Sequence, residues 1–125
     1  MTTFRDWLAE AKIDLQAASS LGQAGFYAQA CFHCQQGVEK ALKAFLIFKK
    51  NELPKSHSLR ELASKAGRLE ELRELISDLE GDYTATRYLD VAGKPLNALY
   101  TSKEFKKRFA SAEKTIELIE KWMKT

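Results

Sequence analysis

Apolar residues recur every three or four positions along most of this chain, and this spacing is typical of amphipathic helices. The first such segment begins at Thr3, which resembles a helix N-cap with an acid in the first turn, and is expected to end near Leu21. The second runs from Phe26 to about Lys50 and stops before Pro54. At ~1.5 Å per residue, this second helix would form a central pillar of roughly 40 Å.

Two hydroxyl residues mark further helix starts in the second half of the chain. Ser58 with Glu61 has the spacing of a capping box and opens a short helix. Thr101 with Glu104 has the same spacing and opens the last helix. Between them, leucines at helical spacing predict another helix that ends before Gly81. The helices predicted in this half cover residues 58–66, 69–80 and 101–124.

The stretch DYTATRYLDVAGKPLNALY, residues 82–100, has no clear pattern. Its first half could continue as a helix, whereas DVAGKPLN is expected to form a loop. No part of the chain alternates apolar and polar residues with β-branched enrichment, so no sheet is predicted. The sequence therefore predicts an all-α fold, an antiparallel up-and-down bundle of four main helices plus a short helix, in one domain over residues 1–125.

Composition limits the classes of function. Apolar residues make up 45% and charged residues 30% of the chain, the balance of an ordinary globular domain. The 20 basic and 17 acidic side chains give a net charge of +3, which permits an anionic ligand but is low for a dedicated duplex-DNA binder. No long apolar run is present and the N-terminus is amphipathic, so we expect a cytoplasmic protein with no membrane segment.

Cys31 and Cys34 have the C-x-x-C spacing of some redox and metal sites. They lie in the middle of a predicted helix, on the same face as Val38 and Phe45, and no second cysteine pair follows. We therefore interpret them as two small buried hydrophobic residues in a reducing compartment. No metal site is predicted, because zinc would need further ligands.

The predicted second helix has an apolar face and a mixed face. On the mixed face, four polar residues alternate with Phe32 and Leu46; they are Gln35, Gln36, Glu39 and Lys43. Such a mixture is typical of a face that another chain half covers or that lines a groove. Taken alone, Glu39 and Lys43 could also be a solvated ion pair, which would stabilise the helix by only ~0.3–0.5 kcal/mol.

One of the two histidines lies next to a predicted helix start. His57 and Lys55 are close to the free backbone N–H groups of the third helix, where an anion could bind. The alternative, that His57 caps the helix or packs the loop, is favoured equally. For His33 we expect an ordinary surface or interface position rather than a catalytic role.

A second polar and aromatic cluster is expected around Arg87. Tyr83 lies one helical turn before Arg87, and Tyr88 follows it directly. A guanidinium flanked by aromatic rings suits the recognition of phosphates and bases. Arg87 and Asp90 could equally form a local ion pair that anchors the following loop.

Four segments, in order and over nearly the whole chain, resemble the HEPN family (higher eukaryote and prokaryote nucleotide-binding). The family pattern is an A-x-x-D-L first helix, a second helix with Y-x-x-A and Q-Q-x-x-E-K-x-L-K-A, a P-x-x-H-x-L-x-x-L connection and a Y-x-x-x-R-Y-P-D element. The segments here are DWLAEAKIDLQAA, FYAQACFHCQQGVEKALKAFLI, LPKSHSLREL and DYTATRYLD. The resemblance implies a helical bundle that commonly forms a homodimer and is often encoded beside a minimal nucleotidyltransferase, in pairs that include toxin–antitoxin systems.

The chain departs from the family at two points. Ribonuclease members of the broader group carry an Arg followed four to six residues later by a His, and no histidine of this chain follows an arginine at that distance. We therefore assign no catalytic residue and favour a protein that is not an enzyme. Leu89 replaces the proline of the last motif, which should change the loop geometry more than the chemistry.

The leading hypothesis is a HEPN-like protein that binds a nucleotide such as ATP, without another cofactor, and acts with a nucleotidyltransferase partner. Lys43, His57 and Arg87 would contact phosphate, and Tyr83 or Tyr88 would stack. Gln36 and Glu39 would complete this site by forming a polar wall.

Two alternatives belong to other classes. One is a metal-independent ribonuclease toxin that acts on RNA with an atypical acid and base. The other is a purely structural dimerisation module, in which Phe32, Gln36, Glu39 and Lys43 form the contact surface.

Overall fold

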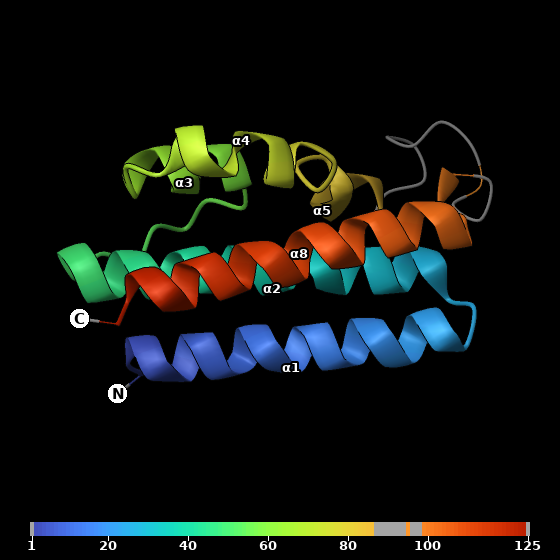
Figure 1. The fold of residues 1–125 in the computed structure, drawn as a ribbon, viewed down its shortest axis with the longest axis horizontal. Coiled ribbons are helices and arrows are strands. Elements are labelled where there is room, and N and C mark those ends of the chain that lie inside the picture. Colours follow the sequence, from blue (N-terminus) through green and yellow to red (C-terminus); the bar gives the residue numbers. More distant parts are fainter. Residues whose placement is uncertain (1, 87–94, 96–98, 125) are drawn as a thin grey trace.

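The structure is a computed structural model that describes residues 2–86, 95 and 99–124. Within these residues all regular secondary structure is helical, which confirms the predicted all-α class (Figure 1). The helices are α1 (Phe4–Gln23), α2 (Tyr27–Lys50), α3 (Leu59–Lys65), α4 (Leu69–Ser77), α5 (Asp82–Ala85) and α8 (Ser102–Trp122).

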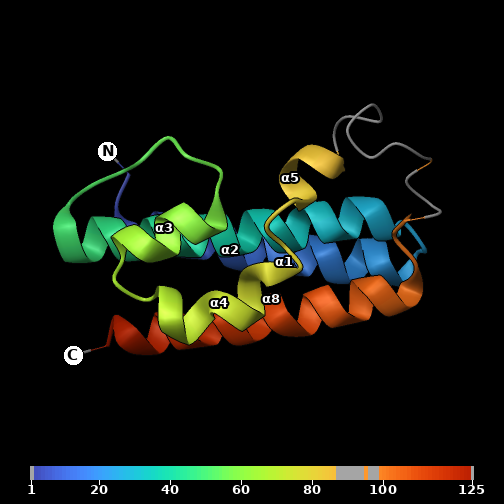
Figure 2. The ribbon, with the colours of Figure 1, turned by 90° about the horizontal axis from the view of Figure 1, so that it is seen from above.

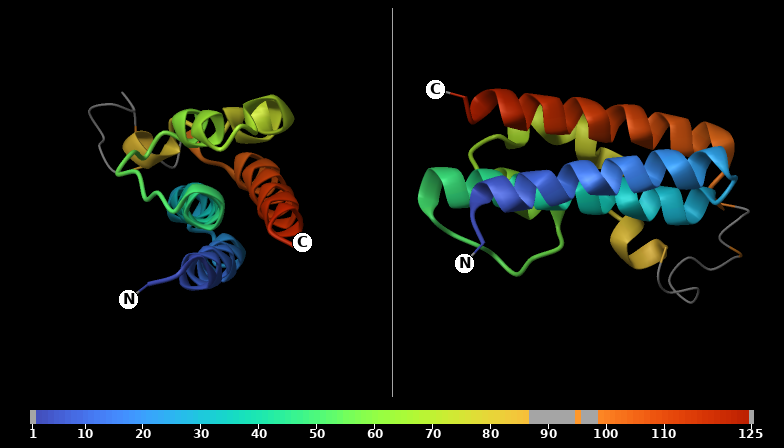
Figure 3. Two further views of the ribbon diagram at one scale, coloured as in Figure 1. Left: turned by 90° about the vertical axis from the view of Figure 1, so that its left-hand side faces the viewer. Right: turned by 90° about the horizontal axis from the view of Figure 1, so that it is seen from below.

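Three long helices form the body of the molecule. In Figure 1, α1 runs antiparallel to α2 and α8, and α4 runs antiparallel to α8. The end-on view in Figure 3 shows α3 and α4 covering α2 and α8 on the side away from α1. Helix α2 packs against α1, α3, α5 and α8, so it is the central pillar that the sequence predicts.

Side-chain caps define several helix starts, as the sequence predicts. The Thr3 hydroxyl accepts from the Asp6 N–H at 3.4 Å, and the Asp6 carboxylate accepts from the Thr3 N–H at 2.7 Å, which is a complete capping box. Ser58 caps α3 by accepting from the Glu61 N–H at 3.1 Å. The Glu61 carboxylate, however, accepts from the Ser56 hydroxyl at 3.0 Å, so this cap is not the reciprocal box.

The N-cap of the last helix, α8, has the same one-sided form. Thr101 accepts from the Glu104 N–H at 3.4 Å, which starts α8 where the sequence predicts. The Glu104 carboxylate accepts from Arg108 Nη1 at 2.6 Å. Because Glu104 is paired with Arg108, it does not accept from the Thr101 N–H as it would in a reciprocal capping box.

Helix α4 ends three residues before the predicted boundary. The N–H groups of Leu79 and Glu80 both donate to the Ile76 carbonyl at 3.0 Å, and this tight turn directs the chain toward α5. The turn places the Glu80 carboxylate at the start of α3, where it accepts from the Ser58 hydroxyl at 2.7 Å and the Arg60 N–H at 2.8 Å. Helix α4 is therefore shorter than predicted, because Glu80 caps α3 instead of continuing α4.

The connection over residues 51–58 determines the position of the site. Asn51 ends α2 in the left-handed region, with φ 54°. The connection then arcs back along α2, so that α3 begins beside the middle of that helix (Figure 2). His57 is thereby brought to Gln35, 22 residues earlier in the chain.

The interior is apolar and close-packed around α2. Small residues allow a close approach of α1, since a Cβ on Gly37 would lie 3.2 Å from the carbonyl oxygen of Ala11. Within the described residues, no helix has both the length and the apolar character that a membrane-spanning segment needs. The largest fully buried apolar side chains are Leu42, Leu46, Leu59, Leu62, Leu72, Ile76, Leu79 and Ile119.

Candidate functional site

A buried polar network lies on α2 at the point where the 51–58 connection crosses it. We call this the Glu39 network; its members are Gln35, Gln36, Glu39, Lys43 and His57. Lys43 Nζ lies 3.1 Å from Glu39 Oε2, and the two side chains are only 7% and 5% exposed. The alternative of a solvated ion pair is therefore wrong, because the structure buries both charges.

A histidine and two amides complete the environment of the Glu39 carboxylate. His57 Nδ1 lies 3.2 Å from Oε1 and 3.1 Å from Oε2. Gln35 Nε2 donates to Glu39 Oε1 at 3.2 Å and to the His57 carbonyl at 3.3 Å. Gln36 Nε2 donates to Gln35 Oε1 at 2.7 Å and to Glu39 Oε1 at 3.3 Å. The carboxylate is thus held by donors from α2 and from the connection.

Two other elements enclose this network. Trp7 of α1 covers its end, since Lys43 Nζ lies 6.0 Å from the Trp7 ring centroid. Tyr83 of α5 covers the opposite side by stacking on His57, with ring centroids 4.0 Å apart and planes inclined by 11°. Phe32 extends this aromatic surface, with its ring 6.2 Å from that of Tyr83.

The network is open to solvent along one edge. The His57 side chain is 49% exposed, and Gln36 and Tyr83 are half-buried. Flat aromatic surface and an amide therefore meet at the molecular surface, above the buried Glu39 carboxylate. These groups suit a planar heteroaromatic ligand, because stacking holds its face and the polar groups can hydrogen-bond its edge.

The structure brings together five of the seven residues predicted to bind nucleotide: Gln36, Glu39, Lys43, His57 and Tyr83. Arg87 and Tyr88 lie outside the described residues, as does Asp90. From the sequence, Gln35 was placed on the mixed face of the second helix but not in the site, and Trp7 was not assigned to the site. Gln35 belongs to the Q-Q pair of the family motif, whereas no pattern in the sequence indicates that Trp7 reaches Lys43.

A second charged cluster lies between α1 and α2, on the other side of Gln36. Its centre is Asp14, a carboxylate whose side chain is only 9% exposed. His33 Nδ1 lies 2.8 Å from Asp14 Oδ1, and Lys40 Nζ lies 2.8 Å from Asp14 Oδ2. One buried carboxylate therefore fixes two cationic or potentially cationic side chains of α2.

A third cluster joins α5 to the start of α8. Asp82 is 3% exposed; it accepts from the Tyr100 hydroxyl at 2.7 Å and from Arg108 Nε at 2.6 Å. Burial raises the pKa of the Asp82 carboxyl, and the hydrogen bonds from Tyr100 and Arg108 oppose this rise. Burial and the bond to Asp82 likewise raise the pKa of Tyr100. The cluster holds two chain segments 18 residues apart in the sequence.

Cys31 and Cys34 are both free and fully buried, as the sequence analysis expects. Burial, with the nearby Asp82 carboxylate, raises the pKa of Cys31 to about 12. Burial also raises the pKa of Cys34. Within the described ranges, no group of three or more His, Cys, Asp or Glu side chains is arranged to hold a metal ion.

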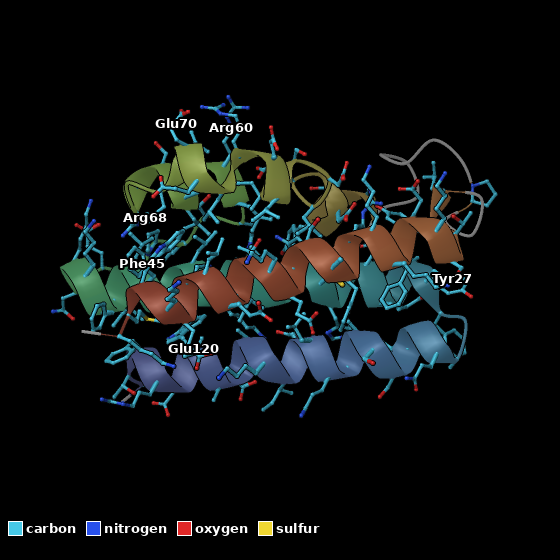
Figure 4. The ribbon with its side chains drawn as sticks, in the orientation of Figure 1. Tyr27, Phe45, Arg60, Arg68, Glu70 and Glu120 are labelled. Carbon is cyan, nitrogen blue, oxygen red and sulfur yellow. The ribbon has the colours of Figure 1, made fainter. Side chains whose placement is uncertain are left out.

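One hollow lies at the start of α2 and another lies between α1 and the second half of α2. One, of about 440 Å³, is at the α1–α2 turn, and its lining includes Tyr27, which Figure 4 shows at the opposite end of α2 from Phe45. The other, of about 330 Å³, is lined by Trp7, Lys40 and acidic residues of α1. Of these two, only the second borders the Glu39 network, since its wall includes Trp7, which covers the Lys43 end of the network.

Solved structures and a protein-family model match this chain. Among solved structures, the crystal structure of TT1696 from Thermus thermophilus matches with a TM-score of 0.87 and 31% identity, over 97% of this chain and 98% of that one. The crystal structure of ST0689, an archaeal HEPN homologue, matches with a TM-score of 0.85 and 28% identity, over 99% and 100%. No curated protein matches. The HEPN domain model matches residues 4–122, and the chain therefore belongs to the HEPN domain family.

Proposed function

We propose that this protein binds a nucleotide at the open edge of the Glu39 network and acts with a nucleotidyltransferase-type partner. The observation that carries the proposal is the stacked pair of His57 and Tyr83 directly beside the Glu39 carboxylate. The exposed part of this pair offers an aromatic face for a base. Gln36 lies next to it and can hydrogen-bond the edge of the base or the sugar. The buried Glu39 carboxylate holds Gln36 and His57 in position for this contact.

The cost of burying the network supports a functional role. Burial of Glu39 and Lys43 requires desolvation of two charges, and apolar residues of similar size are often neutral or stabilising at such positions. Packing of a helical bundle therefore does not require this pair. A binding site explains its presence, because a buried carboxylate surrounded by fixed donors is preorganised to orient a ligand.

The structure changes the role proposed for Lys43. The sequence-based hypothesis gave it a phosphate contact, but its side chain is 7% exposed and its ammonium group is bound to Glu39. In the present proposal Lys43 holds the Glu39 carboxylate in place, and His57 and Tyr83 contact the base. For Arg87 and Tyr88 the proposed contacts rest on the sequence alone.

Isothermal titration calorimetry with ATP and Mg²⁺ at physiological salt tests the proposal. We expect measurable binding by the wild-type protein and a loss of about tenfold in affinity for Tyr83→Leu, since base stacking is worth ~1–3 kcal/mol. Tyr27→Leu is the matched control, because Tyr27 lines the hollow at the other end of α2. Absence of heat with the wild-type protein would overturn nucleotide binding.

The proposed partner follows from the family resemblance, in which such domains are encoded beside minimal nucleotidyltransferases, including toxin–antitoxin pairs. We propose that this chain forms a homodimer in the cytoplasm and associates with such a protein. Co-expression with a nucleotidyltransferase encoded beside its gene, followed by size-exclusion chromatography, tests this. Separate elution of the two proteins at micromolar concentration would contradict the proposal of a stable complex.

A further inference from the structure

We propose that His33 and Lys40, both held by Asp14, form the phosphate subsite of the nucleotide site. The inference rests on the proposed function and adds to it a second group of residues, on the opposite side of Gln36 from His57. It assigns the base and the phosphate of the ligand to different clusters on one face of α2.

The geometry of Asp14 supports this assignment. His33 Nδ1 is hydrogen-bonded to Asp14 Oδ1 at 2.8 Å, and Lys40 Nζ forms an ion pair with Asp14 Oδ2 at 2.8 Å. Both contacts fix groups that would otherwise rotate freely at the surface. With Nδ1 directed to the carboxylate, the other ring nitrogen of His33 is left as the available hydrogen-bonding atom, and the lysine retains further N–H donors.

The charge and exposure of this cluster favour an anion. The cluster places an ammonium group and an imidazole ring next to each other at the surface of α2, and both are groups that bind phosphate. The His33 and Lys40 side chains are 33% and 27% exposed, and are therefore accessible to a ligand. By contrast, the Lys43 side chain is only 7% exposed. Lys40 is thus better placed than Lys43 to contact phosphate.

The two clusters form one continuous surface. His33, Gln36 and Lys40 are spaced by three and four residues, so they lie on the same face of α2 over about two helical turns, roughly 11 Å. The Phe32 ring lies 5.5 Å from the His33 ring and 6.2 Å from the Tyr83 ring. A ligand stacked near Tyr83 can therefore extend past Gln36 to His33 without leaving this face.

The acidic residues of the neighbouring hollow limit the direction of approach. Lys40 also lines the 330 Å³ hollow, together with Asp6 and Glu10 of α1, which would repel phosphate. The Lys40 ammonium group is at Asp14, one turn of α1 beyond Glu10. A phosphate would therefore reach Lys40 from the side of His33 and Gln36, which is also the side of the proposed base site.

Calorimetric titration with ATP, AMP and adenosine separates the two subsites. For the wild-type protein we expect AMP to bind about tenfold more tightly than adenosine, because hydrogen bonds to a charged group are stronger than those between neutral groups. Lys40→Met should remove this preference for AMP while leaving adenosine affinity unchanged. Lys12→Met is the matched control, since Lys12 pairs with Glu120 away from α2 and is 50% exposed.

His33→Asn provides an independent variant. Its amide can replace Nδ1 as the partner of Asp14, but it removes the outward ring nitrogen. We expect a weaker preference for AMP with unchanged thermal stability. Retained adenosine binding by both variants shows that they are folded, so a loss of AMP affinity is attributable to the subsite.

The failures of the two proposals are distinguishable. If AMP and adenosine bind the wild-type protein equally, or if Lys40→Met and His33→Asn keep the preference for AMP, the phosphate subsite is wrong while the base site stands. If ATP, AMP and adenosine all fail to bind the wild-type protein, the proposed function is wrong and the phosphate subsite is wrong as well.

Discussion

The rings of His57 and Tyr83 stack with their centroids 4.0 Å apart, although 51–58 is a connection without helix and Tyr83 belongs to the short helix α5. This contact joins the connection to α5 over the Glu39 network. It is the link on which both the shape of the base site and the closure of the network depend.

Loss of this stacking should loosen the connection more than it destabilises the fold. For His57→Ala we expect faster amide hydrogen exchange in residues 51–58 and a decrease of ~1 kcal/mol in the free energy of unfolding, the scale of one aromatic pair. Hydrogen–deuterium exchange with mass spectrometry measures the first effect. Phe26→Ala, at a 56% exposed position, is the control and should leave this exchange unchanged.

The buried pair of Glu39 and Lys43 should show strong coupling. Glu39→Leu leaves the Lys43 ammonium group buried without its carboxylate, and we expect a loss of ~3–5 kcal/mol in the free energy of unfolding. The double substitution Glu39→Leu and Lys43→Met should cost less than the sum of the single ones. Urea denaturation of the four proteins measures this coupling.

The exposed pair of Glu61 and Lys65 is the matched control for that cycle. It has the same i, i+4 spacing on a helix, but its side chains are 51% and 46% exposed. Lys65→Ala should change the free energy of unfolding by less than ~0.5 kcal/mol. Equal effects at both pairs would contradict the burial of the Glu39 network.

Gly22 should not tolerate a side chain, because a Cβ at this position would overlap the Phe105 ring. We expect Gly22→Ala to destabilise the fold by ~1–3 kcal/mol, which outweighs the helix propensity gained. Gly81→Ala is the control, since a Cβ there meets no atom within 4 Å and its φ is −88°. Thermal denaturation followed by circular dichroism compares the two variants.

Arg108→Met should destabilise the protein in a pH-dependent way. It removes the cation 2.6 Å from Asp82, a buried carboxyl whose pKa burial already raises. Loss of the guanidinium destabilises only the ionised form of Asp82. The decrease of ~3–5 kcal/mol in the free energy of unfolding expected at pH 7 should therefore become smaller at acidic pH, where Asp82 takes up a proton. Chemical denaturation at pH 7 and about pH 5 tests this, and a loss independent of pH would contradict it. Lys107→Met, whose side chain is 61% exposed, is the control.

The two cysteines should be unreactive in the folded protein. Burial raises the pKa of Cys31 to about 12, so its thiolate is scarce near neutral pH and no reagent reaches the sulfur. Titration with Ellman's reagent at pH 8 should give almost no thiols in the native state and two after denaturation. Rapid native reaction would show that α2 opens locally.

The helical fold was largely predictable because its signals are local. The caps at Thr3, Ser58 and Thr101, and apolar residues at helical spacing, define helix starts without information from distant parts of the chain. Helix ends were less accurate, as at α4, where a contact between Glu80 and α3 ends the helix. Tertiary contacts of this kind leave no local pattern.

The grouping of Gln36, Glu39, Lys43, His57 and Tyr83 could be predicted from the sequence, but the contribution of Trp7 and the burial of Glu39 and Lys43 could not. A helical wheel places Glu39 and Lys43 on one stripe, yet their exposure depends on Trp7 and on the path of residues 51–58. The pairing of Asp14 with His33 and Lys40 depends in turn on the register between α1 and α2. The chemistry of these side chains was readable from the sequence, but their partners required the fold.

The path of the 51–58 connection also has a consequence for folding kinetics. Helices α1 and α2 are joined by a short turn and can associate early, because their closure costs little chain entropy. His57 reaches Glu39 only after the chain has reversed direction and α5 has docked. The polar network is therefore expected to assemble last, so that a ligand bound there would slow unfolding without accelerating folding.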